Sequence, residues 1–453
     1  MVLPPKPKPG GQISVPKKNP ISHSVTDAVS HKAHVTPDDT VSPAPTGVEA
    51  SCASDNKEVS PDVTYDAPVM PASSTKQTEP SESFPHNIPK TIPIILGGDG
   101  HVYALFRGPS GNPHAERITG KFFKNYLRLR ARQEGIALGR SMLSDVIDYL
   151  QAYADTSAEE KNVWLRTAQT QDGSGITLDC GDDHHTHIQV TAGKVEIITE
   201  DSDTLFHRRP IMKAFPIPAE TGDLNLLKKY INLHTADVVL LVAWIIYTLV
   251  HPKVSTTNYV ILALRGDQGS GKSFLCKIIQ ALTDPCFVGP QTFPRNEKDL
   301  VIAAQNSHVL FYDNMRNISQ AMSDKLCIAS TGGALSTRRL YTDAEQHVHW
   351  LHVALVLNGI HSFIEQPDLA SRCLPLYLLP IDEKARRSES EIFQEFQADL
   401  PKIFRGLLDR IAEILKVLPS VEVKNPERMI DFVRWLAAME KVNGAPTGVY
   451  QAQ

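Results

Sequence analysis

An α/β fold built on a parallel sheet is predicted by three observations in the second half of the chain. Residues 259–264 form a short apolar run that is typical of a buried strand. The glycine-rich sequence GDQGSGKS follows at 266–273, and residues 274–282 then carry apolar side chains at helical spacing. A buried strand that leads through such a loop into a helix is the local architecture of a phosphate-binding loop.

Phosphate binding requires this order of elements. Glycines allow backbone N–H groups to turn inward without a Cβ in the way, and the helix N-terminus adds the positive end of its dipole. Lys272 then reaches the β- and γ-phosphates, and the Ser273 hydroxyl is a ligand for Mg²⁺. We therefore predict a nucleoside triphosphate and Mg²⁺ as ligands; the alternative is a glycine-rich turn. The predicted nucleotide-binding residues are Gly266, Asp267, Gln268, Gly269, Ser270, Gly271, Lys272, Ser273 and Phe274.

The bulk composition excludes several classes of protein. The formal net charge is −5, so any nucleic-acid contact needs a local basic patch. The six cysteines form no CxxC pair, which favours reduced residues and a cytoplasmic location over a disulfide framework or a zinc site. The N-terminus lacks the apolar core of a signal peptide. The longest apolar run, 238–250, is too short to span a bilayer, so we expect a buried helix there and no membrane partner.

Composition divides the chain into four regions. The first is rich in Pro, Ser and Thr, lacks periodic apolar positions, and is predicted to be disordered. The second mixes strand-like and helix-like segments without a motif that names a function, and the third holds the phosphate loop. These regions are a tail at 1–90, a smaller mixed α/β accessory domain at 91–220, a P-loop domain at 221–385 and a C-terminal helical region at 386–453.

Two features of the accessory domain have open interpretations. The predicted helix at 122–132 is basic and carries aromatic residues, so it fits either a nucleic-acid contact or a solvated basic face. The sequence DDHHTH at 182–187 contains metal-ligand residue types, but no second ligand group stands out, which favours a polar hairpin turn. The basic residues at the helix are Lys121, Lys124, Arg128, Arg130 and Arg132.

A second apolar strand in the P-loop domain ends in an acid. Residues 309–312 are apolar, and Asp313 and Asn314 follow them. In P-loop enzymes a strand beside the loop presents an Asp that holds Mg²⁺. We therefore predict that Ser273 and Asp313 hold the metal ion; the alternative is a strand followed by an Asp-Asn turn.

Three further polar features follow along the chain. Residues 335–341 and 346–350 flank a TDAE turn, which predicts a β-hairpin that carries Arg338 and Arg339. The apolar strand after it ends in Asn358, whose amide can sense the γ-phosphate and orient the attacking water. Arg372 follows a short helical turn and precedes a strand at 374–379.

This ordered set of elements resembles the superfamily 3 helicase core within the AAA+ class of P-loop NTPases. Residues from about 175 to 440 look like the helicase-type ATPases of bacteriophages and integrative elements, similar to the C-terminal ATPase of poxvirus-type primase–helicases. Any one of these motifs is common, but their order is specific. The stretches that carry the resemblance lie at 241–245, 266–273, 295–300, 311–314, 331–333, 338–343, 356–360 and 367–372.

The resemblance implies an ATP-dependent DNA helicase or translocase that acts in phage or mobile-element replication as a homo-oligomer, a hexameric ring. Lys272, Asp313, Asn358 and Arg372 would be the catalytic residues. Of these, Asn358 would be the sensor 1 residue and Arg372 an arginine finger that reaches the neighbouring subunit's site. The remaining alternative for Arg372 is a surface arginine on a turn.

The same resemblance implies that Arg338 and Arg339 grip the DNA backbone. The DNA would be single-stranded. It would be bound without sequence preference, because phosphate contacts carry no base code. The alternative is that these arginines pair with nearby acids.

Two departures from the family pattern leave other functions open. Asn314 replaces the usual acidic second residue of the Walker B motif, so the general base is not visible. This favours, as the alternative, a nucleotide-gated DNA-binding or helicase-loader protein with little hydrolysis. No primase or polymerase motif precedes the ATPase, so we expect a separate primase as partner; the end of the chain at Gln453 suggests a shortened C-terminus. A small-molecule P-loop kinase fits the order of hairpin, strand and Asn less well.

Overall fold

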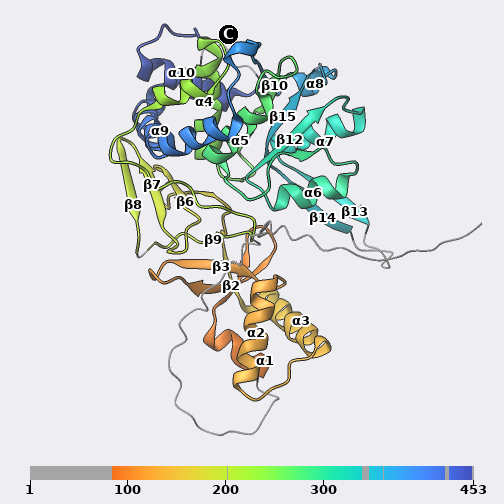
Figure 1. Cartoon of the computed structure of the whole chain (residues 1–453). Helices are drawn as coiled ribbons and strands as arrows, with labels where there is room; N and C mark the ends of the chain where they lie inside the picture. The colour runs from red at the N-terminus through yellow and green to blue at the C-terminus, as the bar shows by residue number, and fades with distance from the viewer. Residues whose placement is uncertain (1–83, 201, 339–345, 361, 424–427, 451–453) are drawn as a thin grey trace, which may run out of the picture. The chain divides into compact units, whose positions relative to one another are not determined.

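The computed structural model describes residues 84–200, 202–338, 346–360, 362–423 and 428–450 (Figure 1). The tail expected to be disordered therefore lies outside the described residues up to position 83. Its predicted boundary at 90 is too late, because helix α1 (Phe84–Thr91) precedes it and buries Phe84 and Ile88. These two apolar residues lie four positions apart on one face of a helix, a signal that the proline-rich composition obscured.

A five-stranded mixed sheet with two helices follows α1. Three antiparallel strands form its centre, and a short parallel strand adds to each edge, in the order β4-β1-β2-β3-β9. Helices α2 and α3 and the strands β1 and β2 share one apolar cluster with α1. The elements are β1 (Ile94–Gly97), β2 (Val102–Arg107), β3 (Pro113–Arg117), α2 (Lys121–Gln133), α3 (Arg140–Ser157), β4 (Glu159–Lys161) and β9 (Phe206–His207). The smaller mixed domain is thus confirmed, although the sequence did not indicate β3, β4 or β9.

A separate four-stranded antiparallel sheet comprises β5 (Thr167–Gln169), β6 (Ile176–Asp179), β7 (His187–Thr191) and β8 (Lys194–Ile198). The sequence places this segment in the accessory domain. In the structure its buried residues, Ile176, Leu178, Ile188 and Val190, belong to the same apolar cluster as the helices around the phosphate loop. The sheet therefore packs as part of the larger core.

The main sheet has five strands, all parallel, in the order β11-β12-β15-β10-β16. They are β10 (Ile261–Arg265), β11 (Gln291–Thr292), β12 (Val309–Met315), β15 (Ala354–Gly359) and β16 (Cys373–Tyr377). The α/β prediction with a parallel sheet is confirmed. One detail differs: β15 lies between β10 and β12, so β12, which carries Asp313 and continues to Met315, is not adjacent to the strand that leads into the loop.

Helices cover both faces of this sheet. Along β10, Leu262 and Leu264 point into one apolar cluster, and Ile261 and Ala263 point into another, as the alternation of a strand buried on both faces requires. The first cluster includes α4 (Thr235–Val250), α5 (Lys272–Thr283), α9 (Glu389–Val417) and α10 (Ile430–Asn443). The second includes α6 (Glu297–Gln305), α7 (Gln320–Thr331) and α8 (Pro367–Ala370).

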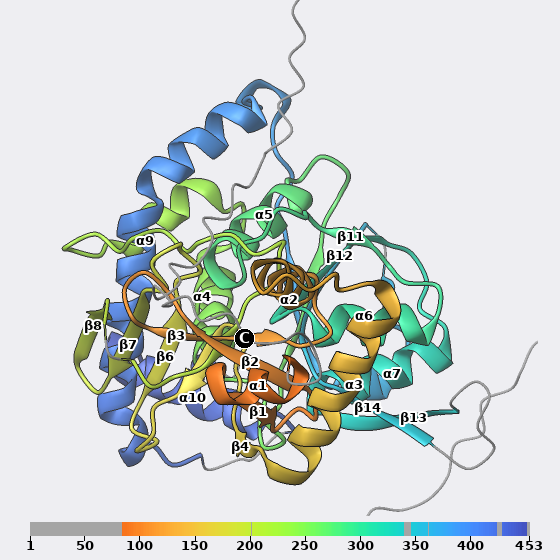
Figure 2. The same ribbon diagram turned by 90° about the horizontal axis from the view of Figure 1, so that it is seen from below.

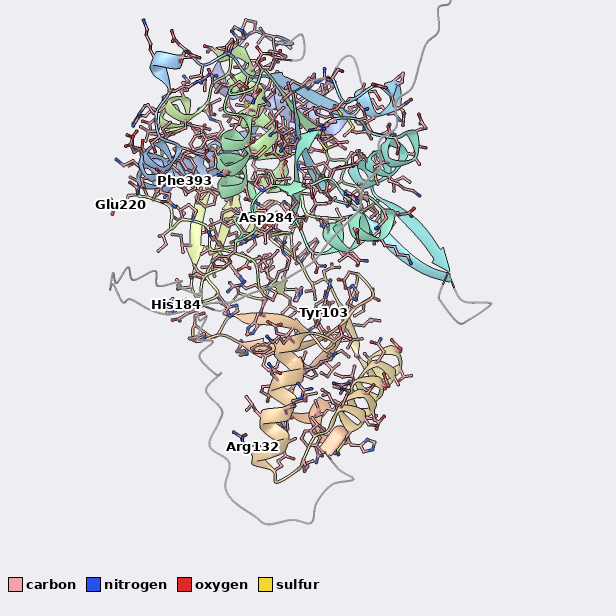
Figure 3. The ribbon with its side chains drawn as sticks, turned by 45° about the vertical axis from the view of Figure 1, so that its right-hand side comes forward. Tyr103, Arg132, His184, Glu220, Asp284 and Phe393 are labelled. Atoms are coloured by element: carbon pink, nitrogen blue, oxygen red, sulfur yellow. The ribbon has the colours of Figure 1, made fainter. Side chains whose placement is uncertain are left out.

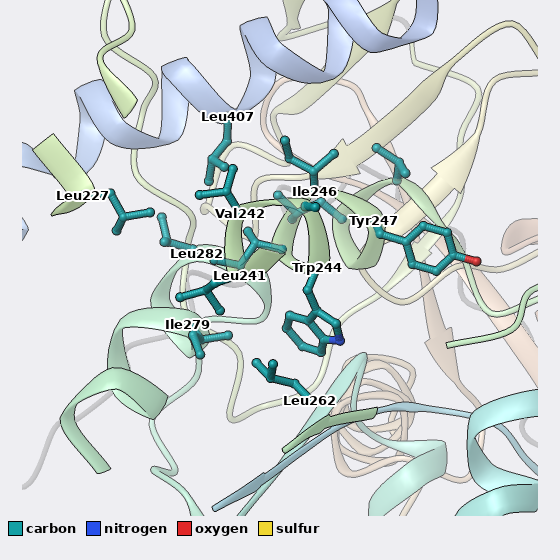
Figure 4. Packing of buried hydrophobic residues seen from close by; sticks show 14 of the residues in the cluster. Leu227, Leu241, Val242, Trp244, Ile246, Tyr247, Leu262, Ile279, Leu282 and Leu407 are labelled. Carbon is teal, nitrogen blue, oxygen red and sulfur yellow. The ribbon is translucent and has the colours of Figure 1, made fainter. Parts of the chain in front are cut away.

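The apolar run at 238–250 is the buried helix α4, as predicted. Its indole residue, Trp244, is fully buried and donates a hydrogen bond from Nε1 to the carbonyl of Val260 at 2.7 Å. Figure 4 shows Leu241 on the same helix facing Ile279 and Leu282 of α5. The phosphate-loop helix is therefore packed against a continuous apolar surface.

In the described part of the chain no single helix is long and apolar enough to cross a membrane. One bent pair passes that test jointly, by length and composition only: the 3₁₀ helix η1 (Leu224–Tyr230) with Thr235–Val250.

The segment before η1 crosses α9 with unusually close backbones. The amide of Ala219 donates to the Pro401 carbonyl at 3.2 Å, and the amide of Asp223 donates to the Lys402 carbonyl at 3.0 Å. A Cβ on Gly222 would lie 2.4 Å from the amide nitrogen of Gly406. The crossing therefore depends on glycine in both segments, because a methyl group on Gly222 would overlap the helix backbone.

The predicted hairpin is present as β13 (Gly333–Arg338) paired antiparallel with β14 (Gln346–Leu351). It projects from the body of the P-loop domain in both Figure 1 and Figure 2. Arg339 lies outside the described residues, as does the side chain of Arg338.

Candidate nucleotide-binding site

The glycine-rich loop connects the carboxyl end of β10 to the first turn of α5, in the strand–loop–helix order predicted from the sequence. Gly271 is the N-cap of α5 and has a left-handed backbone, φ +86°, which favours glycine. At Gly266 a Cβ would lie 2.8 Å from the Ser270 hydroxyl and 3.0 Å from the Leu378 carbonyl. The loop therefore needs glycine for a left-handed turn at one position and for close packing at another.

Lys272 is folded onto the loop from which it rises. Its Nζ donates to the carbonyl oxygens of Gly266 at 2.9 Å and Asp267 at 2.7 Å, and the residue is only 8% exposed. Burial lowers the pKa of this ammonium group. The positive charge is thus held inside the curve of the loop, where the phosphates of a bound nucleotide would lie.

Ser273, Asp313 and Asn358 meet at the carboxyl edge of the sheet. The Ser273 hydroxyl donates to Asp313 Oδ2 at 2.8 Å, and Asn358 Nδ2 donates to Asp313 Oδ1 at 2.6 Å. The backbone N–H of Asn314 also donates to Oδ1, at 2.7 Å. Since β15 lies between β10 and β12, Asn358 near its carboxyl end lies beside the acid.

Asn358 leaves one polar atom unused. The residue is 1% exposed, and among the described residues its Oδ1 has no hydrogen-bond partner. A buried acceptor without a donor costs about 1–3 kcal/mol, so a donor at this place is favoured. A water molecule or a hydroxyl beside Asn358 would satisfy the amide oxygen.

Asn314 has a local structural explanation. Its φ is +56°, in the left-handed region, and it lies where the pairing of β12 with β15 shifts register between Tyr312 and Met315. Asn enters this region more readily than Glu does. Among the described residues, the hydrogen bonds of Ser273 and Asn358 include no carboxylate other than Asp313.

These residues fit a magnesium nucleotide. A hydroxyl and a carboxylate 2.8 Å apart are oxygen ligands within reach of one cation, and Mg²⁺ prefers such ligands. Lys272 supplies positive charge on the phosphate side of the loop. Bound Mg²⁺ would neutralise negative charge on the phosphates.

Arg372 lies at the amino-terminal ends of the parallel strands, whereas the loop lies at their carboxyl ends. The Arg372 carbonyl accepts from the amide of Ile261, the first residue of β10, whereas the loop follows the last residue of that strand. Five strand residues span about 16 Å. Its Nη1 pairs with Asp368 Oδ2 at 2.7 Å. Arg372 is therefore not part of the Ser273–Asp313–Asn358 group of its own chain.

Two residues beside the loop were missed by the sequence analysis. Asn232 donates from Nδ2 to the Ser270 carbonyl at 3.3 Å and also to the Leu379 carbonyl, so it ties the loop to the segment after β16. Arg386 lies close enough that its Nη2 would be 3.4 Å from a Cβ on Gly269. Neither belongs to a motif, and Arg386 was assigned to the separate C-terminal region.

The histidine-rich sequence at 182–187 is a turn. The Thr186 amide donates to the Asp182 carboxylate at 2.8 Å, and His187 Nδ1 lies 2.6 Å from the Ser202 hydroxyl. Within the described ranges, no group of three or more His, Cys, Asp or Glu residues could hold a metal ion. The interpretation as a polar turn agrees with these contacts.

Part of the chain matches a known protein family. Residues 224–452, just over half of the 453 residues, match the family described as actinomycete integrative conjugative element replication protein. The matched segment begins with η1 and includes the phosphate loop, the main sheet, α9 and α10. A comparison with curated proteins gives no match.

Solved structures of the NrS-1 C terminal region are similar at low level. The A form apo structure of residues 305–718 has 10% identity and a TM-score of 0.38, and covers 82% of this chain and 92% of that chain. A second A form structure has 11% identity, the same coverage and a TM-score of 0.37. A further apo structure has 10% identity, covers 82% and 91%, and has a TM-score of 0.37.

Proposed function

Because this chain belongs to the family of replication proteins of actinomycete integrative conjugative elements, we propose that it is an ATP-dependent DNA helicase or translocase of such an element. The observation that supports this proposal is that Ser273 of the phosphate loop and Asn358 both donate hydrogen bonds to Asp313. We further propose that the P-loop domain has an AAA+ superfamily 3-like core, similar to the ATPase of poxvirus-type primase–helicases. We also propose that the protein is cytoplasmic.

Each polar residue at the carboxyl ends of the strands would have a defined role. Lys272 exchanges the carbonyls of Gly266 and Asp267 for the phosphates of ATP. Ser273 and Asp313 hold Mg²⁺. Asn358 donates to Asp313 with its amide nitrogen and accepts from the attacking water with its free amide oxygen, which orients that water toward the γ-phosphate.

Arg372 would act in ATP hydrolysis only in an assembly of several subunits. About 16 Å of strand separates it from the loop of its own chain, so it would act as an arginine finger in a neighbouring subunit. We therefore propose a homo-oligomeric ring, with Arg338 and Arg339 of each hairpin on single-stranded DNA. A separate primase would supply the primers. Native mass measurement with and without ATP tests the assembly, and a monomer under both conditions would exclude the ring.

The main test is ATP turnover with and without single-stranded DNA. Lys272→Ala should lower DNA-stimulated turnover at least about 100-fold, because it removes a charge that stabilises the phosphates. Lys277→Ala is the matched control: this lysine lies on the same helix and pairs with Glu389 on the surface. Protein that binds ATP without DNA-dependent turnover would contradict the helicase proposal.

A nucleotide-gated DNA-binding or loader protein is the second candidate, and Asn314 favours it. Here ATP would control assembly, and hydrolysis would be slow. Asn314→Glu tests the missing acid, but a left-handed backbone disfavours Glu at this position. Asn314→Asp is the better variant, since Asp tolerates the same backbone. A large gain in hydrolysis with Asp would mark the native site as a weak catalyst.

A further inference from the structure

Helix α2 carries five basic residues and no acidic one. The net charge of the whole chain is −5, so the remaining 440 residues carry −10. The neighbouring helix α3 is opposite in character, with Arg140 against Asp145, Asp148 and Asp155. Positive charge is therefore concentrated on one helix of a mostly acidic chain, and this helix lies outside the family-matched segment.

Four of the five basic residues share one face of α2. Lys121, Lys124, Arg128 and Arg132 are three or four residues apart, so each is a neighbour of the next on the helix surface. From first to last they extend over about 16 Å along the axis. The apolar face, with Phe123, Leu127 and Ala131 buried, is a different one.

The four residues of this basic face are accessible and unpaired. Lys121, Arg128 and Arg132 are exposed and Lys124 is half-buried. Among the described residues none of the four takes part in an ion pair, whereas Arg130 pairs with Glu134 at 3.3 Å. Figure 3 shows Arg132 extending from α2 away from the strands. Arg128 donates to the neutral Asn125 side chain at 3.3 Å, which leaves its charge uncompensated. A row of cations without acidic partners attracts a polyanion, because charge repulsion along the row is relieved on binding.

We propose that the basic face of α2, formed by Lys121, Lys124, Arg128 and Arg132, binds the phosphate backbone of DNA independently of the nucleotide site. A regular row of cations at intervals of about 5–6 Å fits a track of phosphates, which carries no sequence code. The inference takes from the proposed function only that DNA is a ligand. It assigns the α1–α3 module a role as a second DNA contact that needs no ATP.

The test is DNA affinity of the full chain as a function of salt, without nucleotide. In one variant Lys124, Arg128 and Arg132 are changed to Gln. In the matched control Lys228, Lys402 and Lys416, which are exposed and take part in no ion pair among the described residues, are changed to Gln. Both variants lose three positive charges and differ mainly in where the charge is removed. Fluorescence anisotropy with a single strand and with a duplex of the same length separates the two forms of DNA.

The α2 variant should bind about 10- to 100-fold more weakly at 0.1 M salt. Its plot of log affinity against log salt should flatten by roughly 0.9 per lost contact for duplex and roughly 0.7 for single strand. The control should change little. Equal losses in both variants, or an unchanged slope in the α2 variant, would overturn the proposal. So would equal binding of polyglutamate, which would make an acidic protein the partner.

Both variants are also measured in the Lys272→Ala background. Loss of DNA affinity on changing α2 in that background supports the inference whether or not the chain hydrolyses ATP. Loss of DNA-stimulated turnover with intact α2-dependent binding would instead concern the proposed ATPase. Thermal unfolding checks the fold, and exposed substitutions of this kind change stability by only about 0.5 kcal/mol.

Discussion

Two carboxylates at opposite ends of helix α5 have opposite surroundings. Asp313 meets the first turn of the helix through Ser273, and its hydrogen-bond donors are a hydroxyl, an amide and a backbone N–H. Asp284 is the C-cap of the same helix and accepts from Arg166 Nε at 2.9 Å and from Arg209 Nη2 at 3.0 and 2.9 Å. Asp284, labelled in Figure 3, is 2% exposed.

The comparison separates a binding acid from a structural one. Burial alone would raise the pKa of Asp284, but Arg209 and Arg166 lower it to about 2, so its charge is permanently compensated. Asp313 has only neutral hydrogen-bond donors among the described residues, so its charge stays available for a cation. We infer that one end of α5 is fixed by ion pairs to the segment before α4, and the other end is left free to bind.

Removing the structural acid should have the largest effect. Asp284→Ala leaves Arg166 and Arg209 buried without their partner, which costs about 3–5 kcal/mol of the free energy of unfolding. Urea unfolding measures this loss. Asp368→Ala is the control, since this carboxylate is itself exposed and one of its two arginine partners, Arg428, is exposed as well. A loss below about 1 kcal/mol for Asp284→Ala would remove the distinction between the two acids.

Removing the binding acid should affect turnover more than stability. Asp313→Ala is expected to lower ATP hydrolysis about 100-fold or more, because the metal loses a ligand. The same change should cost about 1–3 kcal/mol of the free energy of unfolding, less than Asp284→Ala, because Asn358 Nδ2 is left buried without an acceptor. Steady-state hydrolysis and urea unfolding on one preparation measure both. Severe unfolding with Asp313→Ala would place this acid in the structural class.

Low pH should destabilise the folded chain through protonation of Asp284. Its folded-state pKa of about 2 lies below its ordinary value of 3.8, so it stabilises the folded chain above about pH 4. That contribution, about 2 kcal/mol, is lost as the pH falls toward 2. Unfolding of the wild type and Asp284→Asn from pH 6 to pH 2 measures it, because the variant lacks this part of the pH dependence. Parallel curves for the two proteins would contradict the pKa shift.

The smallest effect is expected at Asn314, on the binding side. Asn314→Val should cost about 1–2 kcal/mol of stability, because a β-branched residue is strained at φ +56°. Asn314→Gly should cost little or nothing, since glycine adopts this backbone freely. Thermal unfolding compares the two variants. Equal costs would mean that the side chain of Asn314, and not its backbone, determines the choice of residue.

Local patterns in the sequence predicted the elements around the loop well. The strand expected at 259–264 is Ile261–Arg265, and the helix expected at 274–282 is Lys272–Thr283. Both are defined by short-range periodicity and by glycines with positive φ. The proximity of Ser273, Asp313 and Asn358 was also anticipated, since parallel strands end at the same edge of the sheet.

What the sequence did not reveal depends on contacts between distant segments. No local pattern shows that β15 inserts between β10 and β12, or that β5 to β8 join the larger core. The Arg166–Asp284–Arg209 group joins residues up to 118 positions apart, so its members look like ordinary charged residues. The same holds for Arg386, whose place near Gly269 follows from the packing of the segment before α9.

The crossing of residues 219–223 over α9 has a consequence for genetics. At Gly222 and Gly406 two backbones touch without side chains between them, far along the sequence from the phosphate loop. A single methyl group there would push the two backbones apart, and the weakened packing would fail at a lower temperature. The residues of the phosphate loop would be unchanged. Gly406→Ala is thus a natural starting point for a temperature-sensitive allele, which would let replication of the element be switched off in living cells by warming.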